Sequence, residues 1–400
     1  MITRFDSKAR ALVLALLSFL SVPGLFGQSP DPVILSYQRN FIRASMSTKI
    51  ELLGDATRIT TINMVPLFND AFDFVLQYRP VLGNDSQLVD LAVMAASKCG
   101  QWNDPSILPK VLKTFLEYPD SRVRIACLDT FASLSPGKAE DIKPLNDWFA
   151  SQLSAAPSGG DSATLIACAK TLGKIGSGTS FSVLFKAATS PLDSGLVLAS
   201  KKAINSLKDG YADQILGIFA SRKLQDSYAA FALSRERADL PTETRGTIAQ
   251  SAFSLALESV ATAKGTEAQT VKNLLAESLE ALTELSWSPS SPEVVKYFYQ
   301  VQGDYKNGNA DVSALIPVIR AMGSLGTTES AQALSIFLGL LNSETEQKKT
   351  YNEQLMLAII KALGDLGDKT AFDYLLYVGY LDYPETVKKA SRDALARLQW

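Results

Sequence analysis

The sequence contains no histidine, and this absence removes several kinds of chemistry. Imidazole is the commonest general base in enzymes and a member of the Ser-His-Asp and Cys-His catalytic sets. It is also a standard nitrogen ligand of zinc. Because none of the 400 residues is histidine, such catalytic sets and histidine-ligated zinc sites are excluded. We predict that the protein is not an enzyme, with no catalytic residues, no metal ligands and no cofactor.

Cysteine is scarce as well, since the chain has only Cys99, Cys127 and Cys168. An odd number of cysteines cannot be fully paired within one chain. Cys127 and Cys168 both follow an Ile-Ala dipeptide, which suggests equivalent places in neighbouring helical units. Packed helix axes lie roughly 8–10 Å apart, whereas a disulfide needs Cα atoms within about 7 Å. We therefore expect three free, buried thiols that pack as small apolar groups.

The chain also lacks a strong charge of either sign and a long apolar run. Its net charge is −2, so it does not have the basic surface of a nucleic-acid-binding protein. Beyond residue 27 no stretch is long and apolar enough to span a bilayer. We expect no nucleic acid partner and no transmembrane segment, and a protein or a neutral polymer as the partner.

The first 27 residues are typical of a secretory signal peptide. Arg4, Lys8 and Arg10 form a basic start, and the apolar run Ala11–Leu20 that follows is too short to cross a membrane. We predict cleavage after Gly27. No cysteine lies near this site, so we expect no lipid anchor. The predicted location is periplasmic or extracellular, in a bacterial cell.

The rest of the sequence carries a recurring helical pattern. Counted back from a turn residue, most of the residues at positions −9, −5, −4 and −1 are small or apolar, and these positions share one helix face. Alanine at −9 and −5 lets another helix approach closely, and larger residues at −4 and −1 fill the space between. Where the turn residue is glycine, it is suited to end the first helix in a left-handed cap. The pattern precedes these turn residues: Ser135, Gly176, Lys208, Ser286, Gly326, Gly367 and Gln399.

Three copies of the pattern are especially similar to one another: Leu172-Gly173-Lys174-Ile175-Gly176, Met322-Gly323-Ser324-Leu325-Gly326 and Leu363-Gly364-Asp365-Leu366-Gly367. They resemble HEAT repeats of the short HEAT-like type, within the armadillo-like helical class. The resemblance covers residues 85–400. It implies an all-α fold, namely an α-solenoid of stacked antiparallel helix pairs in a right-handed superhelix. It also implies a protein-binding role, and it transfers no catalytic residue.

The predicted organisation follows from these segments. Residues 1–27 form the signal peptide, and residues 28–84 a divergent N-terminal helical cap with helices around 34–53 and 63–78. Residues 85–400 form the repeat array. Within the array, segment 223–265 fits the pattern poorly and is expected to hold two helices broken at Pro241. The last helix, 384–400, has a polar side that suits a C-terminal cap.

Tyrosines on the second helices of two units are the candidate protein-binding residues. Tyrosine is common at protein interfaces, and solenoids of this kind bind through the surface that their second helices form. A spacing of three residues drifts around a helix, so some members of the set must face the core. The candidates are Tyr297, Tyr299, Tyr374, Tyr377 and Tyr380.

These observations leave three hypotheses for the function. The first is an exported, non-catalytic scaffold or adaptor that binds another envelope protein through the solenoid surface. The alternative is a periplasmic assembly chaperone that holds extended clients in the groove. The third is an enzyme acting on cell-wall polymer, whose structural sign would be a carboxylate pair in the irregular segment 223–265.

Overall fold

The computed structural model describes residues 31–83, 85–135, 137–155, 161–348 and 350–399. The predicted signal peptide, residues 1–27 with its cleavage site after Gly27, lies outside them. In the described residues the regular structure is helical throughout, apart from an isolated bridge between Asp368 and Gln399. The prediction of an all-α fold is therefore confirmed. The chain divides into two compact units, one up to Pro136 and the other from Gly137 onward.

The first unit is built from alternating helices that pack on their second neighbours. Helix α3 packs against α5 and α5 against α7, while α4 packs against α6. Short 3₁₀ turns, Cys99–Trp102 and Pro105–Ile107, connect α5 to α6. The helices of this unit are α2 (Pro32–Arg43), α3 (Met46–Ala56), α4 (Val65–Leu82), α5 (Ser86–Lys98), α6 (Leu108–Glu117) and α7 (Ser121–Leu134).

The helix expected around residues 34–53 is in fact two helices, α2 and α3. Ala44 is extended, and Ser45 accepts a hydrogen bond from the Thr48 backbone N–H as the N-cap of α3. The buried Lys49 side chain donates to the Phe41 and Ile42 carbonyl oxygens at the end of α2. Its ammonium also lies over the rings of Phe41 and Phe74. The Ser45 cap and the Lys49 hydrogen bonds to the carbonyl groups at the end of α2 stabilise the break between the two helices. Apolar periodicity alone does not reveal this break.

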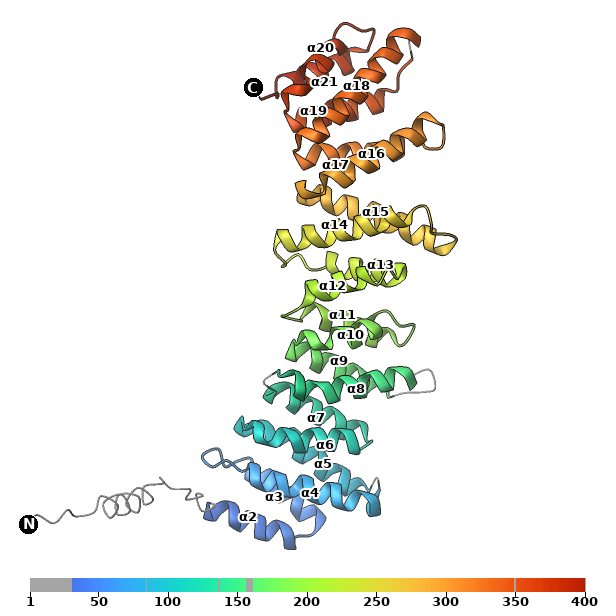
Figure 1. Cartoon of the computed structure of the whole chain (residues 1–400). Coiled ribbons are helices and arrows are strands. Elements are labelled where there is room, and N and C mark those ends of the chain that lie inside the picture. Colours follow the sequence, from blue (N-terminus) through green and yellow to red (C-terminus); the bar gives the residue numbers. More distant parts are fainter. Residues whose placement is uncertain (1–30, 84, 136, 156–160, 349, 400) are drawn as a thin grey trace, which may run out of the picture. The chain divides into compact units, whose positions relative to one another are not determined.

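The second unit shows the same alternation within its own helices, α8 to α21 (Figure 1). Helix α15 packs on α17, α17 on α19 and α19 on α21, while α16 packs on α18 and α18 on α20. The helices are α8 (Ala139–Ala155), α9 (Ser162–Ile175), α10 (Phe181–Ala188), α11 (Ser194–Asn205), α12 (Tyr211–Ala220), α13 (Leu224–Arg235), α14 (Thr242–Ser259), α15 (Thr266–Leu285), α16 (Ser291–Lys306), α17 (Val312–Leu325), α18 (Thr328–Lys348), α19 (Glu353–Leu366), α20 (Phe372–Val378) and α21 (Glu385–Leu395).

Most residues at positions −5 and −4 of the sequence pattern lie in the core of this unit, although Leu395 is half-buried. Four such pairs are fully or almost fully buried: Ala203 and Ile204, Ala281 and Leu282, Ala321 and Met322, and Ala362 and Leu363. The final glycine of the three clearest copies is a left-handed C-cap, as predicted, with φ of 76° at Gly176, 68° at Gly326 and 64° at Gly367.

The other glycine of each copy has a different role, which the sequence pattern did not reveal. A Cβ placed on Gly173 would lie 2.7 Å from the Ala203 Cα, and one on Gly323 would lie 2.9 Å from the Ala362 Cβ. In both places the glycine of one helix faces the alanine at position −5 of the helix that packs on it. These glycines therefore allow the close approach of neighbouring helices.

The irregular segment 223–265 contains two helices, α13 and α14, and Pro241 is the N-cap of α14, as predicted. Helix α14 packs closely with α15. The Trp287 ring at the end of α15 lies directly on Gly246 of α14, and its indole Nε1–H donates to the Gln250 side-chain oxygen at 2.9 Å.

Candidate protein-binding groove

Helix α18 is apolar on two faces, and only one of them is covered by other helices. Leu334, Phe337 and Leu338 are buried, whereas 51% of Ile336 and 42% of Leu340 is exposed. Ile336 and Leu340 are four residues apart, so they lie on the same face of the helix. Scattered exposed apolar residues are ordinary, but a contiguous apolar face indicates a surface used for binding.

A groove of ≈510 Å³ lies along this face, between α18 and α20. This volume is within the range of protein binding pockets. Gly339 lies at the floor of the groove, where its lack of a side chain leaves space for a neighbouring ring. The Tyr374 ring occupies that place, with its Cε1 atom 2.8 Å from the position that a Cβ on Gly339 would take. The groove is lined by Ile336, Gly339, Leu340, Asn342, Ser343, Asp373, Tyr374 and Tyr377.

The presence of glycine at this position is costly for the helix. Gly339 lies in the interior of α18 and has no positive φ, so no turn requires it. Glycine inside a helix is less stable than alanine by about 1 kcal/mol. In exchange for this lower helix stability, Gly339 allows the Tyr374 ring to pack against the helix backbone and leaves the groove open beside it.

The rim of the groove is polar and acidic. The Tyr377 hydroxyl donates to the Glu346 carboxylate at 3.1 Å, and the exposed Asp373 is the only charged residue among the lining residues that the structure describes. The hydrogen bond to Glu346 raises the pKa of Tyr377, together with partial desolvation and the carboxylate charge. The Asn342 side-chain amide donates a hydrogen bond to the Tyr374 carbonyl oxygen at 3.2 Å.

The structure brings two of the five predicted tyrosines together, because Tyr374 and Tyr377 both line the groove. Tyr299 is exposed on α16, a helix that packs against α18, and Tyr380 is exposed just beyond α20. Tyr297 is different. It is half-buried, its ring meets that of Phe253 on α14 edge to face at 5.8 Å, and burial raises the pKa of its hydroxyl.

Sequence reasoning missed Ile336, Gly339 and Leu340. The run Ala333–Leu341 is apolar at most positions, so periodicity does not separate the core-facing residues from the exposed ones. A helix that is apolar all round is usually buried on all sides. The interior glycine was the available signal, since it is a poor helix residue in a segment otherwise well suited to a helix.

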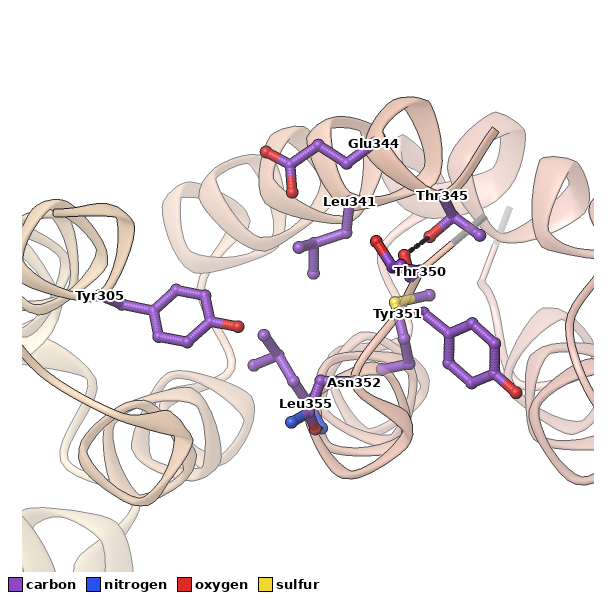
Figure 2. Close-up of a pocket in the computed structure, with 9 residues that line it drawn as sticks. Tyr305, Leu341, Glu344, Thr345, Thr350, Tyr351, Asn352 and Leu355 are labelled. Atoms are coloured by element: carbon purple, nitrogen blue, oxygen red, sulfur yellow. Dashed lines mark hydrogen bonds between the residues drawn. The ribbon is translucent and has the colours of Figure 1, made fainter. Parts of the chain in front are cut away.

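A second hollow of ≈260 Å³ lies where α18 connects to α19 (Figure 2). Tyr305 of α16 points toward it from one side, and Thr345, Thr350 and Tyr351 lie on the other. Several of its polar groups have partners within the protein. Thr345 donates to the Thr350 carbonyl oxygen at 3.2 Å, and the Asn352 side chain accepts from the Leu355 backbone N–H.

The wall of this second hollow is also fixed by Tyr383, which lies behind it in the core. The Tyr383 hydroxyl bonds to Thr345 at 2.9 Å and to Asn342 at 3.1 Å, and its ring packs against Tyr351. These hydrogen bonds hold α18 against Thr350 and Tyr383, so we assign this hollow a structural role. The groove between α18 and α20 is therefore the candidate site.

The three cysteines offer no reactive site. Cys99, Cys127 and Cys168 are free and buried, as predicted. Burial raises the pKa of the Cys99 thiol to about 12 and raises the pKa of the other two as well. Among the residues that the structure describes, no group of three cysteine or acidic side chains could hold a metal ion. No helix in the described ranges is both long and apolar enough to cross a bilayer.

Fold and site together define an all-α protein with an exposed, acid-rimmed apolar groove on one pair of helices. Comparison with known proteins does not narrow this class, because no protein-family model matches the chain and no curated protein is significantly similar to it.

Proposed function

We propose that the protein is an exported, non-catalytic scaffold or adaptor built from HEAT-like repeats, and that it binds another envelope protein through its second helices. The observation that carries this proposal is the apolar groove between α18 and α20. The basic and apolar start of the sequence supports export. The lack of any histidine supports a role without catalysis.

The packing of the second unit supports a solenoid. Alternate helices pack on one another: α15 on α17, α17 on α19 and α19 on α21, and likewise α16 on α18 and α18 on α20. Glycine facing alanine recurs at Gly173 with Ala203 and at Gly323 with Ala362. In stacked repeats each unit contacts its neighbours in the same way, so the same helix-to-helix contact is expected to recur along the chain. In such an arrangement α16, α18 and α20 are the second helices, and two of them carry exposed tyrosines, Tyr299 on α16 and Tyr377 on α20.

A site-specific crosslinking experiment tests the proposal. A photoreactive amino acid replaces Tyr377 in the full chain, which is expressed in the source cell and irradiated in intact envelopes. We expect one defined protein to be crosslinked. Leu340→Lys places a charge in the apolar groove, so it should remove most of this product.

Leu198→Lys is the matched control, because Leu198 is an exposed leucine of α11, with no place in the groove. It should leave the crosslink unchanged. A crosslink that survives Leu340→Lys, or that both substitutions weaken equally, would contradict binding through this groove.

A further inference from the structure

The walls of the groove restrict what kind of segment can occupy it. Both walls are helices, and helix backbone N–H and C=O groups are bonded to one another along the helix. An extended peptide in this groove would therefore find no free strand edge, and its own backbone groups would gain no partners from the walls. A helical segment has already satisfied its backbone, so only its side chains need to fit. This favours a helix as the occupant.

The floor of the groove determines the side chains of the occupant's inner face. Ile336, Leu340 and the ring of Tyr374 offer an apolar surface on either side of Gly339. Burying apolar side chains there gains roughly 25 cal/mol for each Å² removed from water. A volume of ≈510 Å³ accommodates more than one large aliphatic or aromatic side chain. The occupant therefore presents apolar anchors on one face, spaced three or four residues apart.

The rim determines the charge of the flanking side chains. Asp373 lines the groove, and Glu346 lies at its edge, bonded to Tyr377. None of the described residues in the lining is basic. Lys348 and Lys349 follow Glu346 closely in the sequence, and Lys369 precedes α20, where it helps to lower the pKa of Asp368. Two carboxylates beside an apolar floor attract lysine and arginine and repel acidic side chains.

We propose that the groove between α18 and α20 binds an amphipathic helix of its partner protein, with apolar anchors in the groove and basic residues facing Asp373 and Glu346. This inference rests on the proposed function, because it specifies the partner segment of the same site. It differs from a chaperone role, since a site that needs a preformed helix does not hold extended clients.

Synthetic peptides of known helicity test the inference with the full mature chain. The first peptide is an amphipathic helix with leucine and phenylalanine anchors and lysines beside them. The second is identical except that glutamate replaces the lysines. The third keeps the composition of the first but has prolines in the centre, so that it cannot form a helix. Binding is measured by fluorescence anisotropy at low and at high salt.

We expect the lysine peptide to bind about threefold to tenfold more tightly than the glutamate peptide, as one or two exposed ion pairs allow. Salt should reduce this difference because it screens exposed charges. The double substitution Asp373→Lys and Glu346→Lys should reverse the preference. The double substitution Asp213→Lys and Glu243→Lys is the control, since both residues are exposed, on α12 and α14, and together they make the same charge change on other helices.

Each other outcome overturns the inference or the proposal on which it rests. Equal binding of the lysine and glutamate peptides refutes the charge preference, and equal binding of the proline peptide refutes the helix and favours an extended client. In both cases the proposed function survives if Leu340→Lys still abolishes binding. If no peptide binds and Leu340→Lys also leaves the crosslink in intact envelopes unchanged, both the inference and the proposed function are wrong.

Discussion

At the scale of single residues, the two glycines of each Leu-Gly-x-Leu-Gly copy are distinguished by what surrounds them. Gly326 and Gly367 have positive φ and end their helices, whereas Gly173 and Gly323 lie inside helices against an alanine of the helix packed beside them. Either role forbids a larger residue, but for a different reason. Sequence spacing predicted the cap, and the contact became visible only in the packed structure.

Replacing Gly323 by alanine separates helix propensity from packing. Alanine gains about 1 kcal/mol of helix propensity over glycine, but its Cβ would lie 2.9 Å from the Ala362 Cβ. We expect a net loss of about 1–3 kcal/mol in the free energy of unfolding, the usual cost of overpacking. Urea denaturation followed by circular dichroism measures it.

Gly217→Ala is the matched control, because Gly217 lies inside α12 and nothing would lie within 4 Å of its added Cβ. It should stabilise the protein by roughly 0.5–1 kcal/mol. If both substitutions stabilise the protein equally, the close approach of α17 and α19 is not important for stability.

The cysteines provide a second prediction at the residue scale. Burial raises the pKa of the Cys99 thiol to about 12 and raises that of Cys127 and Cys168 too. Because the thiolate is the reactive form, a disulfide reagent at pH 8 should label the folded protein very slowly. In denaturant all three thiols should react at the rate of a free cysteine. Rapid labelling of any one thiol in the folded protein would show that its surroundings open to solvent.

At the scale of helices, several beginnings are set by side chains that the sequence makes visible. Asp85, Asp120, Asp161, Asp193 and Asp311 accept backbone hydrogen bonds at the start of their helices, as N-caps of this type do. These helices, with Pro241 before α14, were accessible from sequence. The break between α2 and α3 was not, because a buried lysine from the second helix stabilises the end of the first.

A link between two helices gives a prediction with a definite pH dependence. Arg235 of α13 donates to the Glu284 carboxylate of α15 at 2.7 Å, and this hydrogen bond holds the pKa of Glu284 below its usual range. The contribution to stability is present above the unfolded pKa of Glu284. It is lost as the pH falls through the lowered pKa of the folded state.

A double-mutant cycle with Arg235→Met and Glu284→Gln measures this link. We expect a coupling energy of roughly 0.5 kcal/mol at pH 7 and low salt, typical of a partly exposed pair. It should shrink toward zero below the pKa of the folded-state carboxyl. A coupling that is unchanged in strong acid would mean that the two side chains interact through packing and not through charge.

At the scale of the whole molecule, composition and periodicity were sufficient to predict an all-helical protein with buried free thiols. They were not sufficient to locate the candidate site. Tyr374 and Tyr377 were named from their spacing, but the groove also depends on Ile336, Gly339 and Leu340, which lie on another helix. Which apolar residues stay exposed depends on how neighbouring helices cover α18. This exposure is a property of tertiary packing, and it cannot be predicted from the periodicity of one sequence.

The division of the chain into two compact units predicts that a local loss of stability stays local. In proteins built from local contacts, opening one element mainly affects the elements that pack on it. Helix α17 packs on α15, α16, α18 and α19, so Gly323→Ala should accelerate amide hydrogen exchange in these helices. A loss of 1.4 kcal/mol corresponds to about a tenfold increase. Exchange in α4, α5 and α6 of the first unit should stay at the wild-type rate, both in Gly323→Ala and in Gly217→Ala. Mass spectrometry of peptides from both units distinguishes the outcomes, because equal acceleration in α4–α6 would mean that the whole chain unfolds as one cooperative unit.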